Sequence, residues 1–267
     1  MDTEELFGTA TPLVGMVHLP ALPGAPDYGR SRADIRERAV ADARALEEGG
    51  ADALIVENYG DTPFYADEVP AHVVADMTAL VQSVVAAVDV PVGVNVLRND
   101  AGAALSVAAA AGGRFVRVNV HTGARVTDQG VIEGAAAETI RLRERIDADA
   151  AVLADVAVKH SAPLGERSLA QQVADAVERG HADGLVVSGP GTGEPTDESA
   201  LAAVVEARDA VDPSVPVFVG SGVTAETAPD LLAVADGAIV GTALKIDGVA
   251  TNSVDRSRVE RVVDAVR

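Results

Sequence analysis

The chain has 267 residues, of which 48% are hydrophobic, so it is long enough to form one large buried core. Acidic residues outnumber basic residues by 41 to 21, and the net charge of −20 makes nucleic acid and anionic membranes poor partners. The absence of cysteine excludes disulfides, thiolate metal sites and a cysteine nucleophile. No apolar run reaches the roughly 18 to 20 residues of a membrane span, so we expect a cytoplasmic protein without membrane insertion.

Eight short runs rich in β-branched residues recur along the chain, and each is predicted to be a strand. They begin at Leu13, Ala51, Val90, Arg114, Ala150, Ala182, Val215 and Ala235. Seven of the runs are continuously apolar, as is typical of parallel strands covered by helices on both faces, whereas the fourth alternates. Their starts lie 20 to 39 residues apart, close to the ~30 residues of a βα unit.

Helical segments with start signals lie between these runs. Ser31 and Asp34 form a capping-box pattern before a predicted helix over 32–48, which two glycines end. A second helix is predicted over 197–211, after Thr196. A third is predicted over 225–234, with Thr224 as its N-cap.

The strict alternation of eight strands with helices predicts a single (β/α)8 TIM barrel, an α/β fold. The barrel should occupy about residues 11–267 as one domain, with residues 1–10 as an N-terminal extension. An open, doubly wound sheet is the alternative. Because TIM-barrel active sites lie where the strands end, the residues that close each apolar run are the functional candidates.

Polar side chains close the first four strands. His18 ends the first, Glu57 and Asn58 the second, Asn95 and Arg98 the third, and Arg117, Asn119 and His121 the fourth. We expect His18 and Glu57 to be catalytic. Asn58, Asn95, Arg98, Arg117 and Asn119 are expected to contact the substrate, because these groups converge on one rim.

The fifth strand carries Asp155, Lys159 and His160, which we also predict to be catalytic. Side chains alternate along a strand, so Asp155 and Lys159 should share a face, about 13 Å apart. Only Lys159 and Lys245 are lysines, against 19 arginines, and both follow predicted strands. Lys245 is the weaker candidate, since it can instead pair with an acid such as Asp247.

Glycine-bearing turns follow the last three strands and predict a phosphate site. They contribute Ser188, Gly189, Thr192 and Gly193 after the sixth strand, Gly220, Ser221 and Gly222 after the seventh, and Gly241 and Thr242 after the eighth. Glycine lets backbone N–H groups approach an anion closely, and hydroxyls add donors. The loops after strands seven and eight are the recurrent phosphate site of this fold.

A metal site is less favoured. His18, Glu57, His121, Asp155 and His160 could supply ligands, but no metal-binding spacing groups them. We expect no cofactor, with a divalent metal as the weaker alternative. There is no Walker loop, no G-x-S-x-G elbow and no dinucleotide fingerprint in the first half of the chain.

The scarcity of lysine and of aromatic residues, together with the acidic composition, is typical of adaptation to molar salt. At about 1 M salt the Debye length is roughly 3 Å, so the negative charge would hardly repel a phosphorylated substrate. The acidity therefore indicates a saline habitat rather than a type of substrate.

The blocks VGMVHLPALPGAPDYG, ADALIVENYGDTPF, ADVAVKHSAPLG and SGPGTGEPT, with four others, resemble the BtpA/SgcQ family over about residues 10 to 247. The resemblance implies a TIM barrel of the ribulose-phosphate-binding type. It places the family's motif residues on His18, Glu57, Asn58, Asn95, Arg98, Asn119, Asp155, Lys159, His160, Ser188, Thr192, Gly193, Ser221 and Gly222. Family members are associated by name with photosystem I biogenesis, and relatives with sugar utilisation.

Three functions remain open. The first is an enzyme acting on a phosphorylated sugar or a nucleoside-derived sugar phosphate, by aldol cleavage, isomerisation or epimerisation. These reactions need a base, Glu57 or Asp155, and an electrophile or Schiff-base amine, Lys159. The second is a non-catalytic assembly factor for a membrane complex, and the third is group transfer onto a polyol phosphate. We expect a small phosphorylated substrate and a homo-oligomer.

Overall fold

The predicted strands close into a parallel barrel in the computed structural model, which describes residues 1–157, 161–189 and 196–267. Its strands are β1 (Leu13–His18), β2 (Ala53–Glu57), β3 (Val92–Asn95), β4 (Phe115–Val118), β7 (Ala151–Ala157), β9 (Gly184–Val187), β10 (Val217–Val219) and β11 (Gly237–Val240). They pair in this order, and β11 pairs back with β1. Because the sheet closes, the TIM barrel is confirmed and the open doubly wound alternative is wrong.

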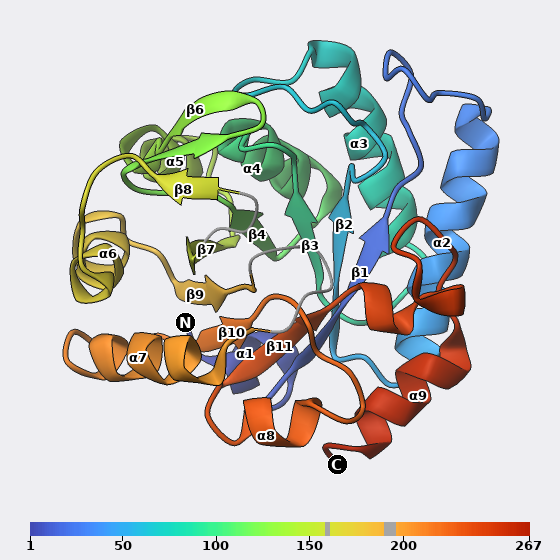
Figure 1. Cartoon of the computed structure of the whole chain (residues 1–267). Coiled ribbons are helices and arrows are strands. Elements are labelled where there is room, and N and C mark those ends of the chain that lie inside the picture. The colour runs from blue at the N-terminus through green and yellow to red at the C-terminus, as the bar shows by residue number, and fades with distance from the viewer. Residues whose placement is uncertain (158–160, 190–195) are drawn as a thin grey trace.

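Helices surround the barrel on its outer side (Figure 1). They are α2 (Arg32–Glu48), α3 (Ala71–Val85), α4 (Ala101–Ala111), α5 (Ala136–Arg145), α6 (Leu169–Ala174) with the π-helical turn Asp175–Arg179, α7 (Glu198–Asp209), α8 (Ala228–Leu232) and α9 (Arg256–Asp264). The 3₁₀ turns Thr242–Leu244 and Ile246–Gly248 precede α9. The helix predicted over 32–48 is confirmed, with the capping box formed by Ser31 and Asp34.

Two predicted helices differ from the observed ones at their ends. The helix α7 begins at Glu198, because Asp197 is itself the N-cap and accepts hydrogen bonds from Ser199 N and Ala200 N. The helix α8 begins only at Ala228, three residues later than predicted. The hydroxyl of Thr224 accepts from the amides of Glu226 and Thr227, so it closes a turn before the helix rather than capping the helix itself.

The amino end of the barrel is closed by aromatic packing. The short helix α1 (Thr3–Phe7) places the ring of Phe7 edge-on against Phe115 and Phe218, with centroid distances of 5.4 and 6.0 Å. We call these three residues the barrel floor. Glycine makes room for them, because a Cβ on Gly93 would lie 2.3 Å from the Phe115 ring. The segment predicted as an N-terminal extension thus packs into the barrel.

A second, smaller sheet was not predicted. Strands β5 (Ala124–Thr127), β6 (Gly130–Glu133) and β8 (Ser161–Pro163) form an antiparallel sheet in the order β6, β5, β8. Its strands lie in the segments that follow β4 and β7, so it lies beside the carboxyl end of the barrel (Figure 1). The signal available in the sequence was Gly130, because a glycine after an alternating run is typical of a hairpin. In the structure Gly130 has a φ of +107°.

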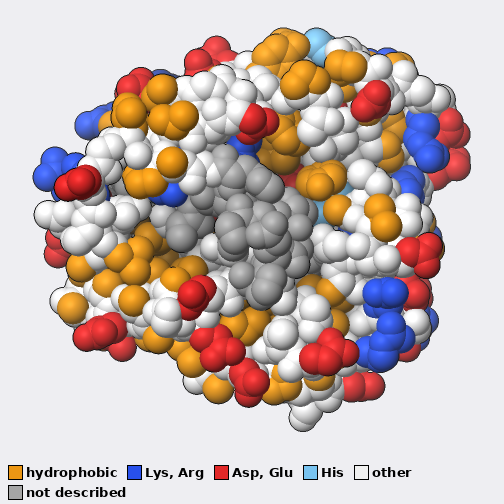
Figure 2. Space-filling view, in the orientation of Figure 1, with side chains coloured by type: hydrophobic (Ala, Val, Ile, Leu, Met, Phe, Trp, Pro, Cys, Tyr) orange, Lys and Arg blue, Asp and Glu red, His pale blue; other side chains and the backbone are white. Residues whose placement is uncertain are grey.

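The surface carries the acidic charge that the composition indicates. Acidic side chains are distributed around the whole face shown in Figure 2, and basic ones lie in fewer groups. Within the described ranges, no helix is both long enough and apolar enough to cross a membrane.

Candidate active site at the carboxyl ends of the strands

The inward-facing side chains change from apolar to polar toward the carboxyl end of the barrel. On β1, Met16 is followed two residues later by His18, and on β2, Ile55 is followed by Glu57. Alternate residues of a strand face the same side, so each pair points into the barrel. The polar residues at this end are His18, Glu57, Asn95, Arg117, Asn119, Asp155 and Ser188, none of them more than 8% exposed. We call this end the barrel mouth.

Glu57 is held at the mouth by its neighbours. Asn95 Nδ2 donates to Glu57 Oε2 at 2.7 Å, and His18 Nε2 lies 3.7 Å from Oε1. His18 Nδ1 is 2.9 Å from the carbonyl oxygen of Ala250, which can only accept, so Nδ1 carries a proton. The nitrogen that faces Glu57 is therefore Nε2, which carries no proton in the neutral ring.

Asn58 has a different role from that predicted by its position. Its Oδ1 accepts from Leu97 N at 2.7 Å, and its Nδ2 donates to Asp61 Oδ2 and to the Leu97 carbonyl oxygen. The side chain thus fixes the loop after β3. This loop carries Arg98, which is 5% exposed and whose pKa is lowered by burial.

Arg117 and Asp155 form a buried bidentate pair. Arg117 Nε and Nη2 donate to the two Asp155 oxygens, each at 2.8 Å, and Nη2 also donates to Ser188 Oγ at 3.2 Å. Burial opposes the charge of Arg117, but the carboxylate outweighs it and raises the pKa of Arg117. Asn119 Nδ2 donates to Asp155 as well, at 3.3 Å. Both carboxylate oxygens of Asp155 are therefore occupied, and the guanidinium of Arg117 is held in a fixed position.

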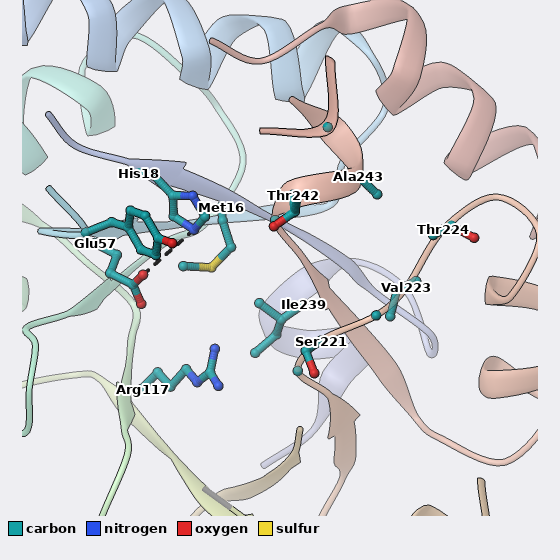
Figure 3. Close-up of a pocket in the computed structure, with 15 residues that line it drawn as sticks. Met16, His18, Glu57, Arg117, Ser221, Val223, Thr224, Ile239, Thr242 and Ala243 are labelled. Atoms are coloured by element: carbon teal, nitrogen blue, oxygen red, sulfur yellow. Dashed lines mark ion pairs between the residues drawn. The ribbon is translucent and has the colours of Figure 1, made fainter. Parts of the chain in front are cut away.

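A small chamber of about 150 Å³ lies between these groups and the turns after β10 and β11. Its wall includes His18, Glu57, Arg117, the turn from Gly220 to Thr224, and Gly241 to Ala243. In Figure 3 Glu57, Arg117, Ser221 and Thr242 surround the same space. Five of the predicted phosphate residues thus lie together, namely Gly220, Ser221, Gly222, Gly241 and Thr242.

Close packing at Gly220 and backbone conformation at Gly222 explain two glycines of the small chamber. A Cβ on Gly220 would lie 2.5 Å from Ser188 Oγ and 3.2 Å from Arg117 Nη2. Gly222 has a φ of +72°, which L side chains rarely adopt. The hydroxyl of Ser221 accepts from Gly189 N at 2.7 Å and ties the turn to the end of β9. The turn after β10 is therefore preorganised.

A large cavity of about 820 Å³ adjoins the small chamber, and the two share Glu57 and Tyr59. Most of the described residues that line it, including Arg98, come from the loops after β1, β2 and β3. The others are Arg38, Glu57, Asn119, Asp128, Thr251 and Asn252. Tyr59 stacks on the ring of His18 with a centroid distance of 4.5 Å. The mouth is thus divided into two adjoining spaces with Glu57 between them.

Lys245 is fully buried beneath the mouth. Its Nζ donates to the carbonyl oxygen of Met16 at 2.7 Å, just beyond the last registered pair of β1 and β11, Gly15 with Val240. Burial lowers the pKa of Lys245 from 10.5 to about 8, although the carboxylate of Asp42 opposes this. The expected pairing with Asp247 is wrong, because the side chain turns inward to β1.

His121 does not join the mouth. Its Nε2 lies 2.7 Å from the carbonyl oxygen of Gly180, and burial lowers its pKa. The expectation that this imidazole converges with Glu57 and Arg117 is therefore wrong. The side chain follows Asn119, beyond the end of β4, and packs instead against the turn before β9.

Four predicted site residues, Lys159, His160, Thr192 and Gly193, lie outside the described residues. The pairing of β7 with β9 shifts register between Asp155 and Ala157, where one extra residue is inserted. The strict alternation of faces is therefore interrupted within the described part of β7. Within ranges 1–157, 161–189 and 196–267, no group of three or more His, Asp or Glu could hold a metal ion.

Comparison with known proteins identifies the family. The BtpA family model matches residues 9–267. The chain belongs to the BtpA family. It is 42% identical to the "Photosystem I biogenesis protein BtpA" of Synechocystis, covering 100% of this chain and 91% of that protein. It is also 33% identical to the "Putative sgc region protein SgcQ" of Escherichia coli, covering 98% and 97%.

Solved structures show the fold of this BtpA-family chain. Tryptophan synthase from Mycobacterium tuberculosis matches with a TM-score of 0.64 and 22% identity, over 98% of this chain and 97% of that one. N-(5'-phosphoribosyl)anthranilate isomerase from Pyrococcus furiosus matches with a TM-score of 0.58 and 13% identity, over 96% and 98%. At these identities the likeness supports the TIM barrel alone.

Proposed function

We propose that this BtpA-family protein is an enzyme that acts on a phosphorylated sugar at the barrel mouth. One observation carries the proposal: a buried carboxylate, Glu57, and a fixed cation, Arg117, face the same small chamber as the glycine turns after β10 and β11 (Figure 3). An anion-binding turn, a base and an electrophile are the three parts that carbon acid chemistry on a sugar phosphate requires.

The phosphate would lie at the turns. Gly222 and Gly241 line the small chamber without side chains that would shield their backbone, and Thr242 adds a hydroxyl. The turns follow the seventh and eighth barrel strands, where phosphate sites recur in this fold. Ser188 and Gly189 support the turn after β10 through Arg117 and Ser221. Thr192 and Gly193 remain proposed contributors.

The reaction would begin with proton transfer to Glu57. The carboxylate removes a proton from the carbon beside the substrate carbonyl, the C–H electron pair forms a C=C bond, and the carbonyl oxygen gains the negative charge. Arg117 stabilises this oxygen, and Asp155 and Ser188 hold Arg117 in place. Delivery of a proton to the same carbon from the opposite face gives epimerisation. Delivery to the former carbonyl carbon, with the hydroxyl proton of the first carbon passing to the former carbonyl oxygen, gives isomerisation. His18 accepts or returns the proton at Glu57.

Glu57 is a better base than Asp155. Both Asp155 oxygens accept hydrogen bonds from Arg117, and we assign Asp155 a positioning role. Asn95 positions Glu57 in the same manner, and Asn58 positions Arg98. Asn119 has a buried Oδ1 for which the described residues offer no donor, and it is left as a candidate acceptor for the substrate.

Lys159 and His160 stay part of the proposal on sequence grounds. Lys159 would act as a Schiff-base amine in aldol cleavage or as a cation beside the oxyanion. Borohydride reduction in the presence of the turned-over sugar phosphate separates these roles. A covalent mass increase in the wild type that is absent in Lys159→Ala supports the imine, and no increase in the wild type contradicts it.

The comparisons agree with this reading to a limited extent. The name of one fold neighbour, the phosphoribosylanthranilate isomerase, contains a phosphorylated sugar. The name of the Synechocystis relative instead favours a second candidate function, assembly of a membrane complex. A pure assembly factor gains nothing from burying Glu57, Arg117 and Asp155 in a barrel mouth, where charged groups cost stability. We therefore favour the enzyme.

Deuterium exchange tests the proposal directly. Ketose and aldose phosphates of three to six carbons are incubated with the protein in deuterium oxide at high salt, and incorporation beside the carbonyl is followed by NMR. We expect exchange into at least one probe, lost in Glu57→Gln. Exchange that persists unchanged in Glu57→Gln, or the absence of exchange in every probe, contradicts the proposal.

Phosphate binding is tested separately. Gly220→Ala should weaken binding of inorganic phosphate, because the added Cβ displaces Ser188 and Arg117. Gly102→Ala is the matched control, since its Cβ meets only ordinary contacts at 3.5 and 3.7 Å in the first turn of α4. Equal affinities of the two variants would move the phosphate site away from the small chamber.

A further inference from the structure

The aromatic residues of this chain occupy only two places. The chain has seven, four Phe and three Tyr. Three Phe form the barrel floor. The other four, Tyr28, Tyr59, Phe64 and Tyr65, all lie in the loops that follow β1 and β2. Outside the barrel floor, the aromatic residues of this chain therefore lie only in the loops after β1 and β2.

Two of these rings line the large cavity. Tyr59 and Phe64 contribute to its wall together with the apolar segment from Leu19 to Ala21. The other two differ: Tyr65 is 52% exposed and Tyr28 is 38% exposed, and neither is among the lining residues. The cavity therefore offers aromatic and aliphatic surface on the side formed by the loops after β1 and β2.

Guanidinium groups complete the wall. Arg30, Arg38 and Arg98 line the cavity, against the carboxylates of Asp27, Glu57 and Asp128. The lining is thus balanced in charge, whereas the whole chain carries −20. Arg38 is held by Asp42 Oδ2 at 2.8 Å, and Arg98 is 5% exposed. Planar guanidinium groups and aromatic rings both stack on flat, delocalised ligands.

The small chamber and the large cavity together offer more volume than a sugar phosphate fills. The small chamber of about 150 Å³ suits a phosphate group, while a cavity of about 820 Å³ is in the range that holds a drug-sized ligand. Because the two adjoin at Glu57 and Tyr59, one ligand can occupy both. A sugar of three to six carbons would leave most of the large cavity filled with water.

We propose that the large cavity binds a planar heteroaromatic group, so that the substrate class is a phosphorylated sugar that has a carbonyl group and carries such a planar group. A nucleoside 5'-monophosphate lacks the carbonyl and serves as a binding probe for this arrangement. This inference rests on the proposed function, since it places the phosphate in the small chamber and the sugar beside Glu57. The ring then lies against Phe64 and the guanidinium of Arg98. Tyr59, stacked on His18, stands at the junction of the two spaces.

The test is a set of equilibrium binding measurements in about 2 M KCl, where long-range repulsion is screened. The probes are inorganic phosphate, ribose 5-phosphate, adenosine monophosphate and uridine monophosphate. We expect at least one monophosphate to bind the wild type tenfold or more tightly than ribose 5-phosphate. Phe64→Ala should remove about tenfold of that advantage, the usual size of a stacking contribution, and leave the other two probes unchanged.

Tyr65→Ala is the matched control, because it deletes the neighbouring ring, which does not line the cavity. It should bind all four probes as the wild type does. Phe64→Leu keeps apolar bulk without a flat ring, and its melting curve verifies the fold if Phe64→Ala is unstable. It should lose the same preference for the monophosphate.

The outcomes separate this inference from the proposed function. If phosphate and ribose 5-phosphate bind but neither monophosphate binds more tightly, the inference fails and the proposed function stands. The same holds if Phe64→Ala weakens all phosphorylated probes equally or if Tyr65→Ala matches Phe64→Ala. If no probe binds, inorganic phosphate included, the proposed function fails and this inference with it.

Discussion

The two ends of the barrel are built from opposite kinds of side chain, apolar at the floor and polar or charged at the mouth. The floor is three Phe side chains packed edge to face, with Phe115 and Phe218 fully buried. The mouth buries Glu57, Arg117 and Asp155 to a similar degree. Burying a Phe side chain contributes about 2 to 3 kcal/mol, whereas a buried ion pair is often neutral or unfavourable compared with apolar packing. The comparison teaches that the floor stabilises this barrel and that the mouth is retained for another reason.

The polar side chains of the mouth are nevertheless held in place by hydrogen bonds. Most of its polar groups have partners at 2.7 to 3.3 Å within the same ring, such as Asn95 with Glu57 and Asn119 with Asp155. A preorganised network of this kind holds charge in place without reorganisation, which is what a catalytic site needs. Four predictions, from the largest expected effect to the smallest, test this division between the two ends.

The largest effect is expected at the mouth, on Glu57. Glu57→Gln should lower the rate of deuterium exchange by about 10²- to 10⁴-fold, the usual contribution of a general base. The free energy of unfolding should change by no more than about 1 kcal/mol, since the amide fits the same space. Exchange is measured by NMR and stability by urea unfolding. A large loss of stability with a proportionate loss of activity would assign Glu57 a structural role.

At the floor the pattern should be reversed. Phe218→Ala should destabilise the protein by about 3 to 5 kcal/mol, because it opens a cavity against Phe7. Folded protein should bind inorganic phosphate with unchanged affinity. Val126→Ala is the control, because Val126 is 44% exposed and its truncation should change stability by less than about 0.5 kcal/mol. Weaker phosphate binding in folded Phe218→Ala would mean that the two ends are coupled.

Lys245 lies between the two ends, and its burial should make the free energy of unfolding depend on pH. Its pKa is about 8 in the folded protein and 10.5 in the unfolded chain. Between these values the unfolded chain binds the extra proton, so the free energy of unfolding should rise with pH across this window. The difference between these two pKa values corresponds to on the order of 3 kcal/mol.

Lys245→Met removes this titration and keeps a similar apolar stem. The stability of the variant relative to the wild type should therefore fall by about 3 kcal/mol between pH 7.5 and pH 10.5. Urea unfolding at a series of pH values measures the difference. If the free energies of unfolding of the two proteins change with pH in parallel, the Lys245 ammonium is not desolvated, and the prediction is wrong.

The smallest effect per residue is expected from the surface, which belongs to neither end. With 41 acidic residues against 21 basic ones, self-repulsion should weaken the fold at low ionic strength. The melting temperature should rise by about 5 °C or more between about 0.05 M and about 2 M KCl. Phe218→Ala should show the same increase, because the floor carries no charge. A salt-independent melting temperature would contradict the proposed adaptation to molar salt.

The sequence by itself determined the eight barrel strands, the closed barrel and the strand ends that carry polar groups. These features depend on local patterns, namely apolar runs, glycine turns and the capping box before α2, so they could be predicted from neighbouring residues. The family resemblance was likewise present in short motifs and is confirmed. The placement of Ser221 and Thr242 together also followed, because consecutive strands of a barrel end side by side.

Only the tertiary structure decided which polar groups are bound to one another. Arg117 and Asp155 are 38 residues apart, and their bidentate pairing depends on side chains of adjacent strands. The same holds for Lys245, which reaches Met16 across 229 residues, and for His121, which turns to Gly180. A side chain at a strand end can face the barrel axis, a helix or a loop, and packing selects among these directions. Local sequence fixes the position of such a group along the strand, whereas its partner is fixed by the closure of the barrel.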